Sequence, residues 1–313
     1  MVLIETFFSL VLLISALLLV PLFPGLILKV KAFFTGKKGP PLLIKYYTLI
    51  KLVQKGSVYS TSSTFVFSLG PLISCTAALM ALLFFPFAWL RPLFSFQGDI
   101  IVLLYFFGLG RFFTIVAALD TASPFEGMGA AREAFFAFLA EATLFAVLIL
   151  FFRINGALSL GGYFAGQGLL SFDGSRGALL VLVVVGLFMV MLAENARVPV
   201  DDPATHLELT MIHEAMILDH SGPDLALIEF GAFCKLFFYA AFVASLLKPA
   251  HMILNPLLAI LLFYGLVVLV YAAIGVVESV TARLKMPLVP KYLLSSFALV
   301  FFAIILTSLE FIP

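Results

Sequence analysis

The sequence predicts an all-α integral membrane protein with about eight transmembrane helices, organised as a single transmembrane domain over residues 1–313. Hydrophobic residues make up 63% of the chain and charged residues only 11%, whereas about a quarter of the residues in soluble domains are charged. A helix needs roughly 20 apolar residues to cross the hydrocarbon core of a bilayer, and several stretches of this chain reach that length without a charge. The net charge of +1 predicts no nucleic-acid partner.

The first apolar run predicts a helix over residues 4–28. No basic region precedes it, so we expect a retained helix rather than a signal peptide. Pro21 and Pro24 lie near its end, where membrane-embedded helices tolerate proline. In the basic segment that follows, residues 29–63, apolar side chains alternate with lysines over residues 41–55. This pattern predicts a short amphipathic helix on the membrane surface, with its lysines in water.

Apolar stretches and polar connections alternate along the rest of the chain. Seven further transmembrane helices are predicted, at residues 65–90, 99–119, 133–153, 177–197, 228–247, 255–282 and 291–311. A Gly-rich loop at 156–176 separates the fourth helix from the fifth, and a long polar segment at 198–227 separates the fifth from the sixth. Cytoplasmic loops are expected at 29–63, 120–132, 198–227 and 283–290.

The distribution of lysine and arginine predicts how the chain is oriented. Twelve of the 18 lie in the loops on the side of the first loop, four lie on the opposite side, and Arg111 and Lys235 fall inside the membrane. Cytoplasmic loops carry the excess of positive residues. We therefore expect a multi-pass protein of the cell (inner) membrane with both termini on the outer side.

Acidic residues are concentrated in one window. Eight of the 17 fall between positions 194 and 229, and they are Glu194, Asp201, Asp202, Glu208, Glu214, Asp219, Asp224 and Glu229. Clustered carboxylates raise one another's pKa values, and such a cluster beside a membrane is suited to taking up and passing on protons. A solvated, charged loop with no such role is the alternative that the pattern leaves open.

The histidines and cysteines give little sign of a metal or redox centre. His206, His213 and His220 repeat at a spacing of seven, which places them near one helical face but about 10 Å apart along it. Cys75 and Cys234 lie in apolar surroundings and are expected to be packing residues. Because no CxxC pair is present, we expect this chain to bind no iron–sulfur cluster, metal or other cofactor itself.

Four charged residues fall inside predicted transmembrane helices: Arg111, Glu141, Lys235 and Glu278. A charge at a lipid-facing midpoint costs roughly 2.5–3.5 kcal/mol. We therefore expect these side chains to face the bundle interior, to form ion pairs or to line a wet cavity. Two interpretations remain open, namely ion pairs that fix the helix register and a proton path.

Three segments contain recognisable motifs. The first runs Glu194-Asn-Ala-Arg-Val-Pro-Val-Asp-Asp-Pro and continues to Leu207-Glu208-Leu209; the second is Lys38-Gly39-Pro40-Pro41; the third is Gly129-Ala-Ala-Arg132-Glu133, with Glu141 further along the same helix. Together they resemble the family of complex I subunit 1, in its loop between helices 5 and 6, its first loop and the start of its helix 4. The resemblance extends over essentially the whole chain.

The run from Asp201 to Glu214 resembles one branch of that family. Complex I members tend to have Phe-Asp-Leu-Pro-Glu-Ala-Glu where this chain has Val200 to His206, so Ala204 and His206 replace two family acids. The sequence looks closer to the membrane subunits of energy-converting hydrogenases, which include formate hydrogenlyase, hydrogenase-4, the CO-linked hydrogenase and Ech-type complexes. Quinone binding is therefore the less favoured expectation.

The resemblance implies a membrane anchor and coupling subunit of a multi-subunit, hydrogenase-type oxidoreductase. Such a subunit would dock soluble subunits that carry iron–sulfur clusters and, in some relatives, a nickel–iron centre. It would contact antiporter-like membrane subunits and lipid, and it would link electron transfer to proton or sodium translocation. The alternatives are a quinone-chamber subunit of a NADH:quinone oxidoreductase and a stand-alone transporter, although the paired broken helices typical of transporters are not evident.

The acidic window, the intramembrane charges and the resemblance together predict the functional residues. Proton transfer and coupling are expected at Glu141, Glu194, Asp201, Asp202, Glu208, Glu214 and Glu229. Charge pairing is expected at Arg111, Arg132, Arg197, Lys235 and Glu278. None of these residues is expected to be a catalytic residue or a metal ligand.

Overall fold

The computed structural model describes residues 2–156, 158–165, 174–202, 211–247 and 256–310, and every regular element in these ranges is helical. The α-helices are α1 (Val2–Leu19), α2 (Leu22–Phe34), α3 (Ile44–Val53), α4 (Phe65–Leu83), α5 (Asp99–Asp120), α6 (Pro124–Asn155), α7 (Leu160–Ala165), α8 (Gly174–Glu194), α9 (His213–Met216), α10 (Gly222–Leu246), α11 (Pro256–Val280) and α12 (Val289–Glu310). Seven of the described helices are long and apolar enough to cross a membrane, and the number is eight if the bent pair of α1 and α2 counts as one span. The predicted fold class is confirmed for this part of the chain.

The first predicted helix is two helices, so the single span over 4–28 is wrong in its detail. α1 ends at Leu19 and α2 begins at Leu22, and the two are bent by 45°. Pro21 lies at the break and Pro24 in the first turn of α2, where the missing N–H groups cost no hydrogen bond. After the bend the helix continues to Phe34, beyond the predicted end.

Two helices begin earlier than predicted, so the loops expected at 120–132 and 198–227 are shorter. α6 begins at Pro124, directly after Ser123, and α10 begins at Gly222, with Ser221 before it and Pro223 in its first turn. Proline at the start of a helix is favourable because its fixed backbone angle suits the first turn. The helix-start signals were therefore present in both segments, although their polar residues suggested loops. At 32 residues, α6 is about 48 Å long, longer than the hydrocarbon core.

Smaller corrections concern the ends of three other elements. α4 ends at Leu83 rather than at 90, because Pro86 interrupts the chain before the short 3₁₀ turn η1 (Phe87–Trp89). The loop expected at 283–290 contains a second 3₁₀ turn, η2 (Met286–Leu288), and the start of α12. Within the predicted loop at 156–176, residues 160–165 form α7.

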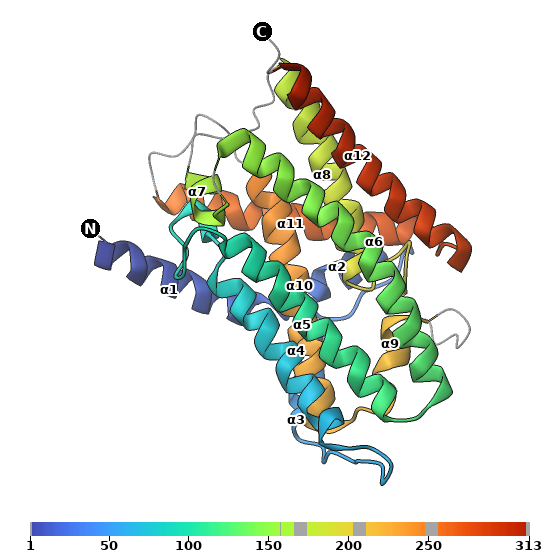
Figure 1. Ribbon diagram of the computed structural model, residues 1–313. Helices are drawn as coiled ribbons and strands as arrows, with labels where there is room; N and C mark the ends of the chain where they lie inside the picture. Colours follow the sequence, from blue (N-terminus) through green and yellow to red (C-terminus); the bar gives the residue numbers. More distant parts are fainter. Residues whose placement is uncertain (1, 157, 166–173, 203–210, 248–255, 311–313) are drawn as a thin grey trace.

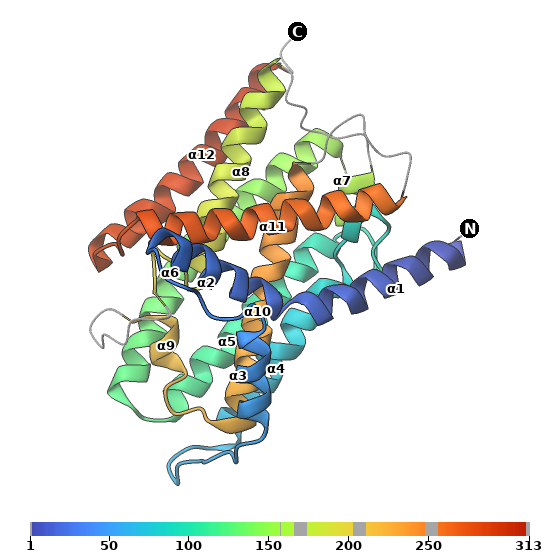
Figure 2. The same cartoon turned by 180° about the vertical axis from the view of Figure 1, so that it is seen from behind.

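A short helix is present in the basic first loop, as predicted, but one of its lysines contacts residues of α10 in addition to water. α3 has no buried residue and packs against α10 and α2 (Figure 2). The Lys45 ammonium lies 5.4 Å from the centre of the Phe233 ring and 3.7 Å from a carboxylate oxygen of Glu229. Lys45 therefore links α3 to the N-terminal half of α10.

α10 is the central helix of the bundle, and it positions the site described below. It packs against α4, α11, α3 and α8 (Figures 1 and 2), and from Leu236 to Leu246 all of its residues are buried. α4 lies alongside α5, and α12 packs against α8 and α6. Between these two groups, α5, α6, α8 and α10 meet, and most of the charged side chains at their contacts are buried in the protein.

The chain ends lie away from the cytoplasmic loops predicted from the sequence. In Figure 1 the first residues of α1 lie at the far left and the last turns of α12 lie at the top, whereas α3 and α9 lie in the lower half. Which side faces the cytoplasm stays a prediction.

Candidate functional site

Arg111 is the centre of a charged cluster inside the helical bundle. It lies in the middle of α5, and its side chain is only 9% exposed. Its Nε lies 3.2 Å from a carboxylate oxygen of Glu133, its Nη1 lies 2.5 Å from one of Glu141, and its Nη2 contacts Glu194. The guanidinium of Arg111 therefore joins α5 to α6 and α8. A planar group with five N–H donors can contact three carboxylates in this way, whereas a lysine ammonium could not reproduce the arrangement.

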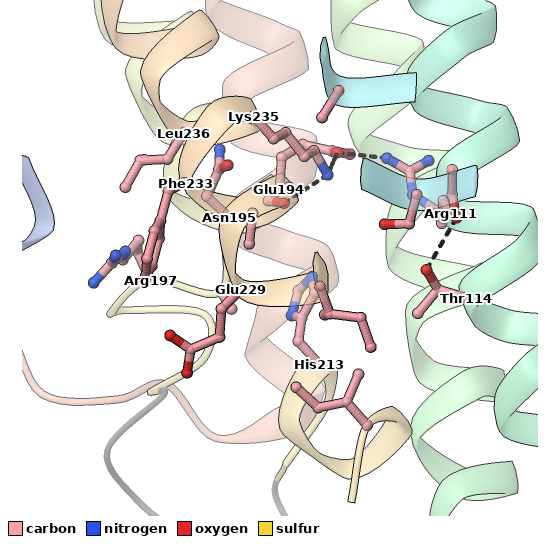
Figure 3. Close-up of a pocket in the computed structure, with 18 of the residues that line it drawn as sticks. Arg111, Thr114, Glu194, Asn195, Arg197, His213, Glu229, Phe233, Lys235 and Leu236 are labelled. Carbon is pink, nitrogen blue, oxygen red and sulfur yellow. Dashed lines mark hydrogen bonds and ion pairs between the residues drawn. The ribbon is translucent and has the colours of Figure 1, made fainter. Parts of the chain in front are cut away.

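Lys235 on α10 completes the cluster from the opposite side. Its ammonium lies 2.8 Å from a carboxylate oxygen of Glu194, and it donates a 2.8 Å hydrogen bond to the backbone oxygen of the same residue. Figure 3 shows Glu194 held between Lys235 and Arg111. Glu194 has a side chain that is 2% exposed, so its charge is stable inside the bundle only because two cations contact it.

The three carboxylates of the cluster differ in their exposure. Those of Glu133 and Glu194 are 7% and 2% exposed, whereas that of Glu141 is 42% exposed. Glu133 and Glu141 are eight residues apart on α6, which is about 12 Å along its axis. The cluster therefore extends from the bundle interior to its surface.

A cavity of about 320 Å³ opens beside the cluster. One part of its wall is apolar, with Ala77, Ala78, Phe106, Phe107 and Phe233; the other part carries charges, including Arg111, Glu133, Glu194, His213 and Glu229. The cavity extends to the partly exposed side chains of Lys31 and Lys45. Apolar walls with a few converging polar groups are typical of small-molecule sites, and the volume is at the lower end for them.

Glu278 belongs to a second group of ion pairs at the rim of the same cavity. Its carboxylate is 1% exposed and lies 2.9 Å from the Lys31 ammonium and 3.4 Å from the Arg197 guanidinium. These contacts join α2, α11 and the segment after α8. Since removal of either cation would leave a buried carboxylate with one partner fewer, this group holds the three elements in register.

Asp201 anchors the loop between α8 and α10. Its side chain is 1% exposed and accepts hydrogen bonds from the backbone N–H groups of Asp202 (2.9 Å), Ile212 (3.3 Å) and His213 (3.1 Å). The Arg283 guanidinium donates a further bond of 2.6 Å. Burial tends to raise the pKa of Asp201, but its contacts with His213 and Arg283 outweigh that effect and hold the pKa below its usual value.

His213 lies between two carboxylates at the cavity wall. Its Nδ1 is 3.3 Å from an oxygen of Asp201, and its Nε2 is 3.2 Å from an oxygen of Glu133. Burial tends to lower the pKa of His213, but the two carboxylates outweigh it and raise the pKa above its usual value.

His220 lies elsewhere. Its ring stacks on Phe67 with centroids 3.9 Å apart, and burial lowers its pKa to about 4. His206 lies outside the described residues. In the described part of the chain, no group of three or more His, Cys, Asp or Glu side chains is arranged to hold a metal ion.

The other residues predicted for coupling and pairing are more dispersed. Glu214 lines the cavity, Glu229 pairs with Lys45 at 3.7 Å, and Arg132 donates a 2.9 Å bond to the backbone oxygen of Met211. Asp202 follows Asp201 and is half-buried. Glu208 lies outside the described residues. The structure thus brings Arg111, Glu141, Glu194 and Lys235 together in one cluster but leaves Glu214 and Glu229 on its periphery.

Two residues of the site were missed as functional candidates. Glu133 appeared only as part of a motif because it was expected at the first residue of a helix, and His213 was grouped with His206 and His220 by their spacing of seven. The early start of α6 carries Glu133 into the bundle. The Ser123-Pro124 helix-start signal could have indicated this, whereas nothing in the sequence separates His213 from His220.

Gly129 fixes the position of α9, and therefore of His213. A Cβ added there would lie 2.8 Å from the Ala215 Cβ and 2.9 Å from the backbone oxygen of Ile212. Replacing Gly129 with Ala is expected to destabilise the protein by about 1–3 kcal/mol, despite the helix propensity of alanine. Thermal unfolding in detergent measures this, with Gly108→Ala as control, since no atom lies within 4 Å of a Cβ added there. Equal stability of the two variants would contradict the assignment.

A sequence profile described as NADH dehydrogenase matches residues 7–309 of this chain. The chain belongs to the NADH dehydrogenase family. The resemblance to complex I subunit 1 is therefore confirmed, and the charged cluster lies within the matched region.

Relatives of this NADH dehydrogenase family member include hydrogenase subunits. The chain is 29% identical to hydrogenase-4 component C of Escherichia coli K12 over 77% of its own length and 75% of the relative's. It is 27% identical to formate hydrogenlyase subunit 4 of the same organism over 94% and 96%. It is also 26% identical to NADH-ubiquinone oxidoreductase chain 1 of Arabidopsis thaliana, over 71% of each chain.

The fold has also been seen in a solved structure. A chain of the membrane-bound sulfane sulfur reductase, an archaeal respiratory membrane complex, superimposes with a TM-score of 0.78 over 96% of this chain and 98% of its own length. The sequence identity is 18%, so this likeness concerns the fold alone.

Proposed function

We propose that this chain is the membrane anchor and coupling subunit of a hydrogenase-type, complex I-related assembly. In this role it docks soluble subunits that carry iron–sulfur clusters, with a nickel–iron centre where the neighbouring subunit retains its ligands. It links electron transfer in those subunits to proton or sodium translocation through antiporter-like membrane subunits. The relatives named as hydrogenase-4 component C and formate hydrogenlyase subunit 4 support the class of assembly.

The observation that carries the proposal is the single guanidinium of Arg111 shared by three carboxylates. Glu133 and Glu194 face the cavity, and Glu141 reaches the outer surface of the bundle. A proton added to any one of these carboxylates weakens its attraction to Arg111 and strengthens the pairing of the other two. A change of charge at the cavity therefore changes the strength of the ion pair at Glu141, because Arg111 contacts all three carboxylates.

Electron transfer near the cavity would drive this shift. An added negative charge in a docked arm raises nearby carboxyl pKa values, and each unit corresponds to about 1.4 kcal/mol. The carboxylate that gains the proton would release it towards the exposed side of Glu141, where a membrane subunit with ionisable residues could accept it. This orientation requires the loops around α3 and α9 to face the cytoplasm, as the distribution of lysine and arginine predicts.

The decisive experiment replaces Glu141 with Gln in the purified complex, reconstituted in liposomes. Gln keeps the shape of the side chain but cannot carry a proton. We expect electron transfer from a reduced viologen donor to stay within about twofold of wild type, and ion translocation per electron to fall at least tenfold. A pH-sensitive dye, with sodium present and absent, reports the translocation and the identity of the ion.

Asp219→Asn is the matched control, because Asp219 is an exposed acid outside the cluster. It should translocate ions like the wild type. Translocation at wild-type stoichiometry in Glu141→Gln would remove the proposal.

The second candidate is a quinone-chamber subunit, which the apolar wall of the 320 Å³ cavity and the NADH-ubiquinone oxidoreductase relative favour. The cavity can accept a compact ring against Phe107 and Phe233. Quinone-dependent electron transfer by the purified complex would support this candidate. Hydrogen evolution from a low-potential donor without quinone would support the first.

A further inference from the structure

His213 occupies an unusual position between two carboxylates that come from different parts of the fold. Asp201 follows α8, and Glu133 lies on α6; the imidazole of His213 lies between them with its Nδ1 3.3 Å from Asp201 and its Nε2 3.2 Å from Glu133. The backbone N–H of His213 also donates to Asp201. The same carboxylate therefore fixes both the backbone and the ring of His213.

Asp201 is a poor proton carrier, because its oxygens are already occupied. It accepts three backbone hydrogen bonds and one from Arg283, and its side chain is 1% exposed. A carboxylate with that many donors remains ionised. An ionised Asp201 beside Nδ1 keeps a proton on that nitrogen, in the way that an aspartate orients the histidine of a catalytic triad.

Nε2 is the ring atom left free to exchange a proton. It is buried and makes no hydrogen bond within the described residues, and the Glu133 oxygen at 3.2 Å is in ion-pair range. The other Glu133 oxygen contacts Arg111, at the centre of the cluster. The side chain as a whole is 23% exposed and lines the cavity, whereas its Nε2 is buried on the side of Glu133.

The charge of the surroundings favours a proton on His213. Arg111 and Lys235 bring two positive charges to the cluster, and Glu133, Glu141 and Glu194 bring three negative charges. Asp201 and Arg283 cancel each other. An imidazolium at His213 therefore offsets the net negative charge of these groups. Arg132 also lies near Asp201 and Arg283, and Glu214 and Glu229 line the same cavity as His213.

We propose that His213 loads protons from the cavity onto Glu133, and that Asp201 is its positioning residue. This inference rests on the proposed coupling function and names the entry step of its proton path. The Nε2–H bond of the imidazolium breaks and an O–H bond forms on Glu133. Neutral His213, with its Nδ1–H held by Asp201, and a neutral Glu133 carboxyl remain.

A small tilt of the ring then brings Nε2 to the cavity, where a hydronium ion from solution gives it a proton, restores the imidazolium and leaves a water molecule. The neutral Glu133 no longer competes for Arg111, so the guanidinium pairs more strongly with Glu141 and Glu194. Each transfer thus redistributes charge across the cluster towards the bundle surface. Nothing in this step requires Asp201 to change its protonation state.

The test compares His213→Gln and Glu133→Gln with wild type in the complete reconstituted complex. His213→Gln is expected to lower ion translocation per electron at least tenfold. In wild type, translocation should decline as the pH rises through the raised pKa of His213, because the imidazolium is then lost. His213→Gln should lack that dependence. Glu133→Gln should lower translocation to a similar extent, because Gln cannot accept the proton. The translocation that remains should decline at a lower pH than in wild type, because one of the two carboxylates that stabilise the imidazolium is gone.

His220→Gln is the matched control, since His220 is a buried histidine outside the cluster; it should keep the wild-type pH profile. If the complex with His213→Gln does not assemble, the shift of the pH profile in Glu133→Gln tests the inference instead. A wild-type pH profile in either His213→Gln or Glu133→Gln overturns the inference. If Glu141→Gln abolishes translocation while His213→Gln retains it, the entry step is wrong and the coupling function stands.

Discussion

Replacing Arg111 with Met is expected to lower the free energy of unfolding by about 3–5 kcal/mol, the cost of breaking a buried ion pair from one side. The guanidinium is 9% exposed and contacts Glu133, Glu141 and Glu194. Methionine fills a similar volume, so the loss comes from charge rather than from packing. Glu194 would then keep Lys235 as a partner and Glu133 would keep His213, whereas Glu141 would lose its ion pair with Arg111. Thermal and denaturant unfolding in detergent measure the effect.

The control for this prediction is Arg153→Met. Arg153 is exposed in the last turn of α6, and substitutions at such sites are usually within about 0.5 kcal/mol of wild type. A second variant, Arg111→Met with Glu133→Gln, should regain part of the lost stability because it removes one of the uncompensated charges. A single variant as stable as wild type would show that the three carboxylates do not depend on Arg111.

Replacing Asp201 with Asn is expected to cost about 3 kcal/mol at neutral pH, since the loop loses charge-assisted hydrogen bonds that contribute roughly 1.5–3 kcal/mol each. Asn keeps one acceptor but turns an NH₂ group towards N–H donors. The segment around Ile212 and His213 should loosen first, because its backbone N–H groups bond to Asp201. Hydrogen exchange at these two amides, with global unfolding measured in parallel, reports the change.

The pH dependence of this effect provides a second check. The pKa of Asp201 is lowered in the folded protein, so its contribution is fully present above the pKa of the unfolded chain, about 3.9. It is lost as the pH falls through the lower, folded-state pKa, because both states then carry a protonated carboxyl. The difference between wild type and Asp201→Asn should therefore shrink in acid. A difference that is the same at pH 7 and below pH 3 would contradict the assignment.

The helical architecture could be predicted from the sequence because a bilayer imposes a simple requirement. Each span needs a long apolar stretch, and its position can be read directly, as the predicted helix at 99–119 and the observed α5 show. Helix starts were less predictable: α6 and α10 begin within polar residues, at Ser123-Pro124 and Ser221-Gly222-Pro223. Polar residues there indicated loops, although local helix-start signals decided the outcome.

The candidate site was predictable as a set of residues but not as an arrangement. Buried charges inside apolar helices must find partners, so composition alone indicates that Arg111, Glu141 and Lys235 are paired. It does not indicate which partner each has, because Arg111 meets Glu133, Glu141 and Glu194 only where α5, α6 and α8 converge. The role of Glu208, outside the described residues, stays a prediction.

The sequence by itself determined that this protein lies in a membrane and which family it belongs to, since these follow from composition and local motifs. It also determined that charged residues inside the apolar helices need partners. The tertiary structure alone decided that His213 lies against Asp201 and Glu133 while His220 stacks on Phe67. Both histidines lie in the same polar segment of the sequence. They differ because Glu133 and Phe67, which are 80 and 153 positions away from them, are brought into contact only by helix packing.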